Sequence, residues 1–188
     1  MTCIVGIQLK DKAIIGGDSC VSTGGNYERH LSAENKVFAR DRFIFGGSGT
    51  VRQRQLLKYS DTPDNWNFDT RPDNIDQFMH TDFIYWARKI FKDGGLLEIN
   101  NNVESFGGSF LIACFGYLFK VASGFSVTHY VDGIYALGCG SEFAYGAMYA
   151  SKNKSPKKRL LAGLEAAEKY SAYIGSPFYF VESCKENK

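Results

Sequence analysis

Apolar residues near the start of the chain form two short runs separated by a polar turn. Residues 3–9 are rich in β-branched and apolar side chains, residues 10–12 are polar, and residues 13–17 are apolar again. Two such runs around a polar break predict the strands of a hairpin. If the strands pair, the end of the second returns to the start of the first. We therefore expect Asp18 to lie close to the Thr2 amine.

The rest of the chain alternates between strand-like and helix-like patterns. Glycine clusters at residues 46–49 and 138–141 each end a strand and precede helical spacing of apolar residues. The order of strands, two helices, strands, two helices and a final strand predicts an α+β fold with helices packed on two stacked sheets. The expected strands cover residues 34–40, 43–48, 109–114, 118–122, 127–130, 134–137 and 178–183. The expected helices cover residues 50–60, 74–93, 142–151 and 156–174, with a turn at residues 24–25.

Composition limits the classes of protein to which such a fold belongs. At 188 residues and 44% hydrophobic content, residues 1–188 fit a single domain with one sizeable core. The net charge is +2 and the charges are interspersed, so no nucleic-acid partner is indicated. There is no signal-peptide pattern, and the most apolar window, residues 110–119, is too short to cross a bilayer. We expect a soluble cytoplasmic protein without a membrane partner.

The cysteines and histidines do not form a recognisable metal site. An odd number of cysteines without a C-x-x-C pair favours reduced thiols over disulfides or zinc. The histidines are scattered without ligand spacing, so we expect neither a metal nor a cofactor. We interpret Cys139 as a small core residue rather than a nucleophile. These residues are Cys3, Cys20, Cys114, Cys139, Cys184, His30, His80 and His129.

Thr2 is the strongest candidate for a reactive group. Because a small residue follows Met1, we expect an aminopeptidase to remove Met1 and leave Thr2 with a hydroxyl and a free amine. An α-amine has a reference pKa of about 7.7–8.0, so near neutral pH part of it can accept the hydroxyl proton. An N-terminal threonine can thus act as its own general base. Threonine is common at position 2, so this hypothesis depends on its combination with Asp18, Lys36 and Gly49.

Five segments of the chain, taken together, carry a resemblance to a known family. They are Thr2, Gly17-Asp18-Ser19, Asn35-Lys36-Val37, Gly47-Ser48-Gly49-Thr50-Val51, and Gly138-Cys139-Gly140-Ser141 followed by Phe143-Ala144-Tyr145-Gly146. They resemble proteasome β-subunits and the bacterial proteasome-like peptidase HslV. The resemblance implies the N-terminal-nucleophile (Ntn) hydrolase fold, a four-layer αββα sandwich of two antiparallel sheets flanked by helices. It also implies a ring-forming homo-oligomer that encloses its active sites and degrades peptides or unfolded proteins.

The resemblance implies catalytic roles for five residues. Thr2 Oγ1 would attack the peptide carbonyl and form an acyl-enzyme ester that water hydrolyses. Asp18 would hold the amine end of the site, and a buried Lys36 would lower the pKa of the hydroxyl by placing a positive charge beside the developing alkoxide. The Gly49 N–H would donate to the oxyanion, a contribution of about 2.7–4 kcal/mol to the barrier. Cys139 stands where the family has a serine that contacts the threonine amine.

The resemblance also implies a substrate-binding set, which consists of Ser22, Glu34 and Gly47. Ser22 stands at the position of a substrate-binding threonine, where the main chain pairs with an extended peptide as an added strand. Gly47 belongs to the same motif as the oxyanion glycine. Glu34 is expected near the pocket for the residue before the scissile bond, where it would favour a basic side chain. The similarity to HslV suggests an ATP-dependent unfoldase as a partner.

A threonine endopeptidase is the leading hypothesis, and two alternatives remain open. The first is a non-catalytic homologue that builds a ring or scaffold with the same fold. It is kept open by Cys139 and by Arg52-Gln53-Arg54, which follows the oxyanion glycine where the family often has Asp. The second is an Ntn amidase acting on small amides, suggested by Cys3-Ile-Val-Gly. It ranks lowest because such enzymes need the cysteine first.

Overall fold

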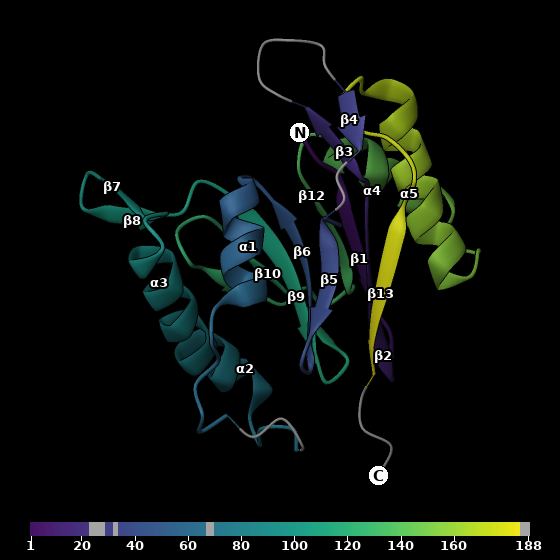
Figure 1. Cartoon of the computed structure of the whole chain (residues 1–188). Coiled ribbons are helices and arrows are strands. Elements are labelled where there is room, and N and C mark those ends of the chain that lie inside the picture. The colour runs from purple at the N-terminus through teal and green to yellow at the C-terminus, as the bar shows by residue number, and fades with distance from the viewer. Residues whose placement is uncertain (23–28, 32–33, 67–69, 185–188) are drawn as a thin grey trace.

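Two antiparallel sheets pack face to face, with helices on both outer sides, in the computed structural model of the chain (Figure 1). It describes residues 1–22, 29–31, 34–66 and 70–184. The turn expected at residues 24–25 lies outside these ranges. Within them, the four-layer αββα sandwich expected from the resemblance is confirmed.

The first sheet contains both strands of the N-terminal hairpin. Strand β1 (Ile4–Gln8) pairs with β2 (Lys12–Gly17) so that the first residue of β1 lies opposite the last residue of β2. Strands β12 (Ile134–Leu137) and β13 (Tyr179–Cys184) complete the order β12-β1-β2-β13. The predicted hairpin is therefore confirmed, and its register brings the segment after β2 back to the start of the chain.

The second sheet has the strand order β11-β10-β9-β6-β5. Its strands lie close to the predicted ranges because their β-branched and aromatic residues are buried on this sheet. Two small hairpins, β3 with β4 and β7 with β8, were not predicted. The bounds are β3 (Cys20–Ser22), β4 (Arg29–Leu31), β5 (Val37–Arg40), β6 (Phe43–Ser48), β7 (Glu98–Asn100), β8 (Val103–Ser105), β9 (Ser109–Cys114), β10 (Tyr117–Val121) and β11 (Val127–Thr128).

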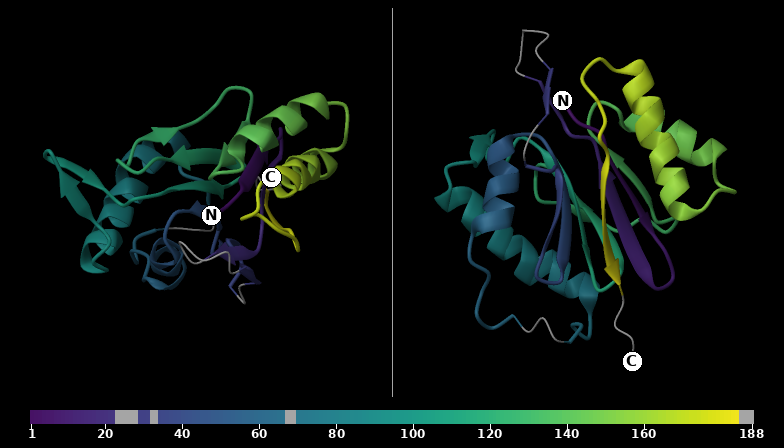
Figure 2. Two further views of the ribbon diagram at one scale, coloured as in Figure 1. Left: turned by 90° about the horizontal axis from the view of Figure 1, so that it is seen from above. Right: turned by 45° about the vertical axis from the view of Figure 1, so that its right-hand side comes forward.

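Helices cover both outer faces of the sandwich (Figure 2). Helices α1 (Val51–Tyr59), α2 (Ile75–Phe78) and α3 (Ile84–Asp93) lie over the second sheet, and α4 (Ser141–Ala150) and α5 (Pro156–Tyr170) lie over the first. The single helix predicted over residues 74–93 contains a π-helical turn, η1 (Met79–Phe83). Within the described residues, no helix is both long and apolar enough to span a membrane.

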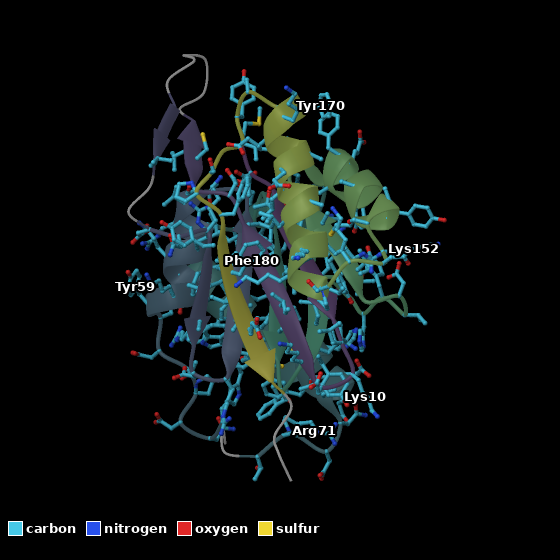
Figure 3. All side chains as sticks on the ribbon, turned by 90° about the vertical axis from the view of Figure 1, so that its right-hand side faces the viewer. Lys10, Tyr59, Arg71, Lys152, Tyr170 and Phe180 are labelled. Carbon is cyan, nitrogen blue, oxygen red and sulfur yellow. The ribbon has the colours of Figure 1, made fainter. Side chains whose placement is uncertain are left out.

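Three hydrophobic clusters fill the spaces between the layers. An aromatic cluster that includes Phe45, Phe83 and Phe110 lies between the second sheet and α1–α3. A cluster of mainly aliphatic residues joins the two sheets, and a third lies between the first sheet and α4–α5. Phe180 of β13 packs against this third cluster beside α5, as Figure 3 shows. The start of β1 is consequently covered on both faces, so a side chain placed there is shielded from water.

Candidate active site

Asp18 and Lys36 form a buried ion pair next to Thr2. Asp18 follows β2 and Lys36 precedes β5, so the two sheets supply one partner each. Lys36 Nζ lies 2.9 Å from both carboxylate oxygens of Asp18. The exposed fractions are 1% for Asp18 and 2% for Lys36. Solvent and salt therefore screen this pair weakly, which is the condition that the proposed role of Lys36 requires.

Backbone N–H groups fix the carboxylate of Asp18 in place. The N–H of Cys3 donates to Oδ1 at 2.9 Å, and the N–H of Cys20 donates to Oδ2 at 3.1 Å. Both oxygens are thus satisfied by charge-assisted hydrogen bonds. Asp18 was expected at the Thr2 amine. Its carboxylate contacts the N–H of the next residue along, and it reaches the Thr2 site through Lys36.

The carbonyl oxygen of Met1 connects Thr2 to Lys36. Thr2 Oγ1 donates to this oxygen at 2.6 Å, and Lys36 Nζ donates to it at 2.9 Å. Thr2 itself is only 4% exposed. The Thr2 hydroxyl and the Lys36 ammonium group therefore converge on one carbonyl oxygen, and Lys36 also contacts the buried carboxylate of Asp18.

Burial lowers the pKa of Lys36 below its ordinary value of 10.5. Desolvation is the largest cause, because it disfavours the charged amine. The Asp18 carboxylate opposes the shift through its charge and its hydrogen bond, while the positive charge of Arg54 adds to it. Lys36 is thus a cation held by one carboxylate, and its proton is easier to remove than that of a surface lysine.

The loop before α4 packs on the carbonyl group of Thr2. Gly140 N–H donates to the Thr2 oxygen at 3.5 Å, and Cys139 Sγ lies 3.6 Å from the same oxygen. Gly138 has φ +86°, and a Cβ at this position would overlap the Thr2 carbonyl. Only glycine fits there. This loop therefore fixes the Thr2 carbonyl, whereas Lys36 contacts the carbonyl of Met1.

The interpretation of Cys139 as a core residue is wrong, because its side chain is exposed. The left-handed turn at Gly138 ends the buried strand β12 and places the next residue at the surface above Thr2. The thiol contacts the Thr2 carbonyl oxygen. Cys3, Cys20 and Cys114 are free thiols as well, and all three are buried.

Gly49 lies in a loop that only glycine can form. Its φ is +135°, and a Cβ there would lie 2.9 Å from Gly108 Cα. The next residue, Thr50, begins α1 by accepting a hydrogen bond from the N–H of Gln53 at 3.2 Å. The backbone of Gly49 is exposed at the end of β6. A backbone N–H in such a loop is open to a ligand, so its role as the oxyanion donor stays a prediction with compatible geometry.

The structure describes contacts for two of the three expected substrate-binding residues and only the backbone of the third. Gly47 N–H donates to the carbonyl oxygen of Lys36 at 3.1 Å, which ties β6 to the ion pair. Glu34 is half-buried and accepts a hydrogen bond from Tyr59 on α1 at 3.4 Å. The backbone of Ser22 belongs to β3, and its side chain lies outside the described part of the structure.

Comparison with known proteins gives a clear result at the level of structure. No protein-family model matches the sequence, and no curated protein matches it. BPH from Thiobacillus denitrificans, solved in complex with epoxomicin, superposes with a TM-score of 0.79 at 19% identity, covering 99% of this chain and 100% of that one. The chain has the proteasome-type Ntn-hydrolase fold.

Two further structures share this proteasome-type fold. Anbu (ancestral beta-subunit) from Yersinia bercovieri has a TM-score of 0.70 at 14% identity, with 97% of this chain and 82% of that chain covered. Eukaryotic HslV from Trypanosoma brucei has a TM-score of 0.64 at 15% identity, with 96% and 98% covered. At these identities the similarity establishes the fold. Any chemistry of the candidate site has to follow from its own residues.

Two residues of α1 that the sequence analysis did not assign to the site, Gln53 and Arg54, are buried against it. Their exposed fractions are 0% and 6%. Arg54 Cγ lies 2.7 Å from the position that a Cβ of Gly47 would occupy, and Gln53 Oε1 lies 3.0 Å from the same position on Gly49. The absence of side chains on these two glycines gives α1 room to turn polar groups inward. That is the one signal in the sequence that could have revealed them.

The thiol of Cys3 is unsuited to nucleophilic attack in this fold. Burial, the negative charge of Asp18 and the neighbouring Cys139 together raise the pKa of Cys3 to about 12, and Lys36 opposes the shift. The thiolate is the reactive form of cysteine, and it is scarce near neutral pH when the pKa is so high. This observation weighs against the amidase alternative.

Proposed function

We propose that this chain is a threonine-type peptidase subunit in which Thr2, freed by removal of Met1, is the nucleophile. The observation that carries the proposal is the convergence of Thr2 Oγ1 and Lys36 Nζ on the Met1 carbonyl oxygen, at 2.6 and 2.9 Å. Cleavage of the Met1–Thr2 bond would leave the Thr2 amine at this position. Nucleophile, base and a charged neighbour would then lie within one buried site.

In the proposed reaction, the Thr2 amine accepts the hydroxyl proton, directly or through water, as Oγ1 bonds to the carbonyl carbon of the scissile peptide. The carbonyl oxygen becomes an oxyanion that the Gly49 N–H stabilises. The C–N bond then breaks, and the leaving nitrogen takes the proton from the Thr2 ammonium. Water hydrolyses the resulting ester and restores the free hydroxyl. Lys36 stabilises the developing alkoxide, and Asp18 holds Lys36 in place.

The proposed subunit works inside a ring-forming homo-oligomer. The proteasome-type fold supports this assembly. Exposed aromatic residues on α4 and at the end of α5 supply apolar surface that self-association would bury. Tyr149 is 71% exposed and Tyr170, labelled in Figure 3, is 69% exposed. An ATP-dependent unfoldase would deliver unfolded protein to such a ring. Analytical ultracentrifugation of the purified protein at micromolar concentration tests the assembly, and a monomer would contradict it.

Thr2→Ala provides the direct test of the peptidase. Alanine, like threonine, is small enough for an aminopeptidase to remove Met1, so the variant keeps the free amine and loses the hydroxyl together with the methyl group beside it. We expect intact-mass measurement to show Met1 removed from both proteins. We also expect Thr2→Ala to abolish both hydrolysis of fluorogenic peptides and labelling by an epoxyketone, which requires amine and hydroxyl together. Thr2→Ser, which keeps both groups, should retain activity.

A non-catalytic ring subunit is the second candidate function, and Cys139 is the observation that favours it. A thiol is a much weaker hydrogen-bonding group than the serine hydroxyl of the family, and here it faces the Thr2 carbonyl oxygen at 3.6 Å. Quantitative retention of Met1 in the cell-made protein would support this candidate and reject the peptidase. Turnover of small amides but not of peptides would instead favour the amidase, and Cys3→Ala would then abolish it.

A further inference from the structure

Arg54 is a buried cation in the wall of the candidate site. It projects from α1, it is 6% exposed, and its Nε is buried without a hydrogen-bond partner in the part of the chain that the structure describes. Buried guanidinium groups usually pair with a carboxylate through two parallel hydrogen bonds. A buried donor without a partner is costly. An anion brought close to this guanidinium by a ligand would offset part of that cost.

Gly47 makes the room that Arg54 occupies. Arg54 Cγ and Cδ lie 2.7 and 3.2 Å from the position of a Cβ on Gly47, so any larger residue would displace the stem of the arginine. Gly47 is also hydrogen-bonded to the backbone of Lys36. The Arg54 side chain thus lies against the strand residue that joins the ion pair to the loop of Gly49.

The carboxylates near Arg54 do not fully compensate its charge. Asp18 is already engaged by Lys36 and by two backbone N–H groups. Glu34 accepts a hydrogen bond from Tyr59. Desolvation lowers the pKa of Arg54 by more than the charges of Glu34 and Asp18 raise it. The engaged carboxylates and the lowered pKa of Arg54 both indicate that an additional anion beside its guanidinium group would be favourable.

We propose that Arg54 binds a carboxylate of the substrate, so that the site prefers peptides with Glu or Asp immediately before the scissile bond. This inference rests on the proposed function, in which the attacked carbonyl is held between Thr2 and Gly49. A side chain begins one bond away from that carbonyl carbon. Gly47 lies two residues before Gly49, and Arg54 packs against it, so we place this side chain against the wall that Gly47 and Arg54 form.

Arg54 and Glu34 lead to opposite expectations for selectivity. Glu34 alone would favour a basic residue before the scissile bond, as expected from the sequence. The structure gives Glu34 a hydrogen bond from the Tyr59 hydroxyl, whereas Arg54 Nε has no partner among the described residues. The more weakly compensated group has more to gain from a charged ligand. One set of substrates therefore decides between the two residues.

The test uses three fluorogenic peptides that differ only in having Glu, Gln or Arg before the scissile bond. We expect wild-type kcat/KM to be at least about tenfold higher for Glu than for Gln, as for a charge-assisted contact to a buried group. Arg54→Met should bring this ratio close to one, mainly by lowering kcat/KM for the Glu peptide. Arg54→Lys should restore part of the ratio. Arg52→Met, which removes an exposed arginine from the same helix, is the matched control and should change nothing.

Unchanged selectivity in Arg54→Met, or a wild-type preference for the Arg peptide, would overturn the role of Arg54. If no peptide is cleaved and no epoxyketone label forms, the proposed peptidase function fails instead. Binding then tests Arg54 separately, through fluorescence anisotropy of labelled, C-terminally amidated peptides that contain one Glu or one Gln. Weaker binding of the Glu peptide to Arg54→Met than to Arg52→Met supports the inference, and equal binding rejects it. Circular dichroism melting establishes that each variant is folded.

Discussion

Lys36 and Arg54 are two buried cations that both contact Gly47, and they differ in how well they are paired. Lys36 has both oxygens of Asp18 and the Met1 carbonyl within 2.9 Å. Arg54 is nearly as buried, yet its Nε has no partner in the described residues. Gly47 donates its N–H to the Lys36 carbonyl and contacts the stem of Arg54. The two cations therefore share one scaffold and differ in their acceptors.

The difference in pairing leads to different expected effects of removing Lys36 and Arg54. Removing one partner of a fully paired buried charge leaves the other charge uncompensated, which is strongly destabilising. Removing a cation that lacks a full set of partners costs little, because no buried anion is left without its counter-ion. In the proposals above, Lys36 belongs to the framework that holds Thr2, and Arg54 binds a ligand carboxylate. The following predictions test that distinction.

Lys36→Met should have the largest effect on stability. It leaves the Asp18 carboxylate buried without its counter-ion, and we expect a loss of about 3–5 kcal/mol in the free energy of unfolding together with loss of peptide hydrolysis. Urea denaturation followed by circular dichroism measures the change. The double variant Asp18→Asn/Lys36→Met, which removes both charges, should recover most of the stability and none of the activity. If the double variant were as unstable as the single one, the ion pair would not explain the loss.

Gly138→Ala should have the next largest effect, through its contact with the Thr2 carbonyl group. A Cβ there overlaps the Thr2 carbonyl, and φ +86° is a strained conformation for alanine. We expect a loss of about 1–3 kcal/mol in stability and a strong fall in kcat, because the Thr2 backbone must move. Gly146→Ala on α4 is the matched control. No atom lies within 4 Å of its Cβ position, so alanine should stabilise the helix by about 0.5–1 kcal/mol. Equal effects of the two substitutions would show that Gly138 does not position Thr2.

The fold and the Lys36 side of the site were predictable from the sequence for identifiable reasons. The β1–β2 hairpin has two apolar runs around a polar turn, and its register necessarily returns Asp18 to the start of the chain. The pairing of Asp18 with Lys36 was not read from spacing, since it joins the ends of strands in different sheets. The motif resemblance supplied Lys36 as a site residue, and the structure added its carboxylate partner.

Other features depend on three-dimensional packing that no local pattern encodes. The sequence analysis named Arg54 only within Arg52-Gln53-Arg54 and gave no indication that it is buried, because burial of a charged residue is rare unless it is paired. Its burial follows from the absence of a side chain on Gly47, which belongs to β6 and lies beside Arg54 in space. The β7–β8 hairpin has an exposed, polar turn with Asn101 and Asn102 at positive φ, so it lacks the alternation of a half-buried strand. Cys139 was misjudged because the turn at Gly138 lies between a buried strand and the surface.

We expect Arg54→Met to raise or lower the free energy of unfolding by less than about 1 kcal/mol. The methionine retains the stem against Gly47 and removes a desolvated charge whose Nε has no partner, and such replacements are often neutral or stabilising. Urea denaturation beside Lys36→Met gives the contrast directly. A loss as large as that of Lys36→Met would mean that Arg54 is a structural ion-pair partner of Glu34, and Glu34→Gln would then show the same loss.

The smallest expected effect is a pH dependence that belongs to Lys36. Its pKa in the folded protein is lowered from 10.5 by burial. As pH rises through the interval below 10.5, the unfolded chain holds the proton longer than the folded chain, so the free energy of unfolding rises with pH. The wild-type curve minus that of Asp18→Asn/Lys36→Met measures the contribution of the ion pair between about pH 8 and 10.5, the interval in which Lys36 is expected to titrate. The Cys3 thiol, with its pKa raised to about 12, gives the opposite slope above pH 9. Because that shift depends partly on Asp18 and Lys36, both proteins are compared in a Cys3→Ala background. If this difference in the free energy of unfolding fell with pH, the Asp18 carboxylate would outweigh desolvation and raise the pKa of Lys36 in the folded protein. Lys36 and Arg54 would then differ even more in how well they are paired.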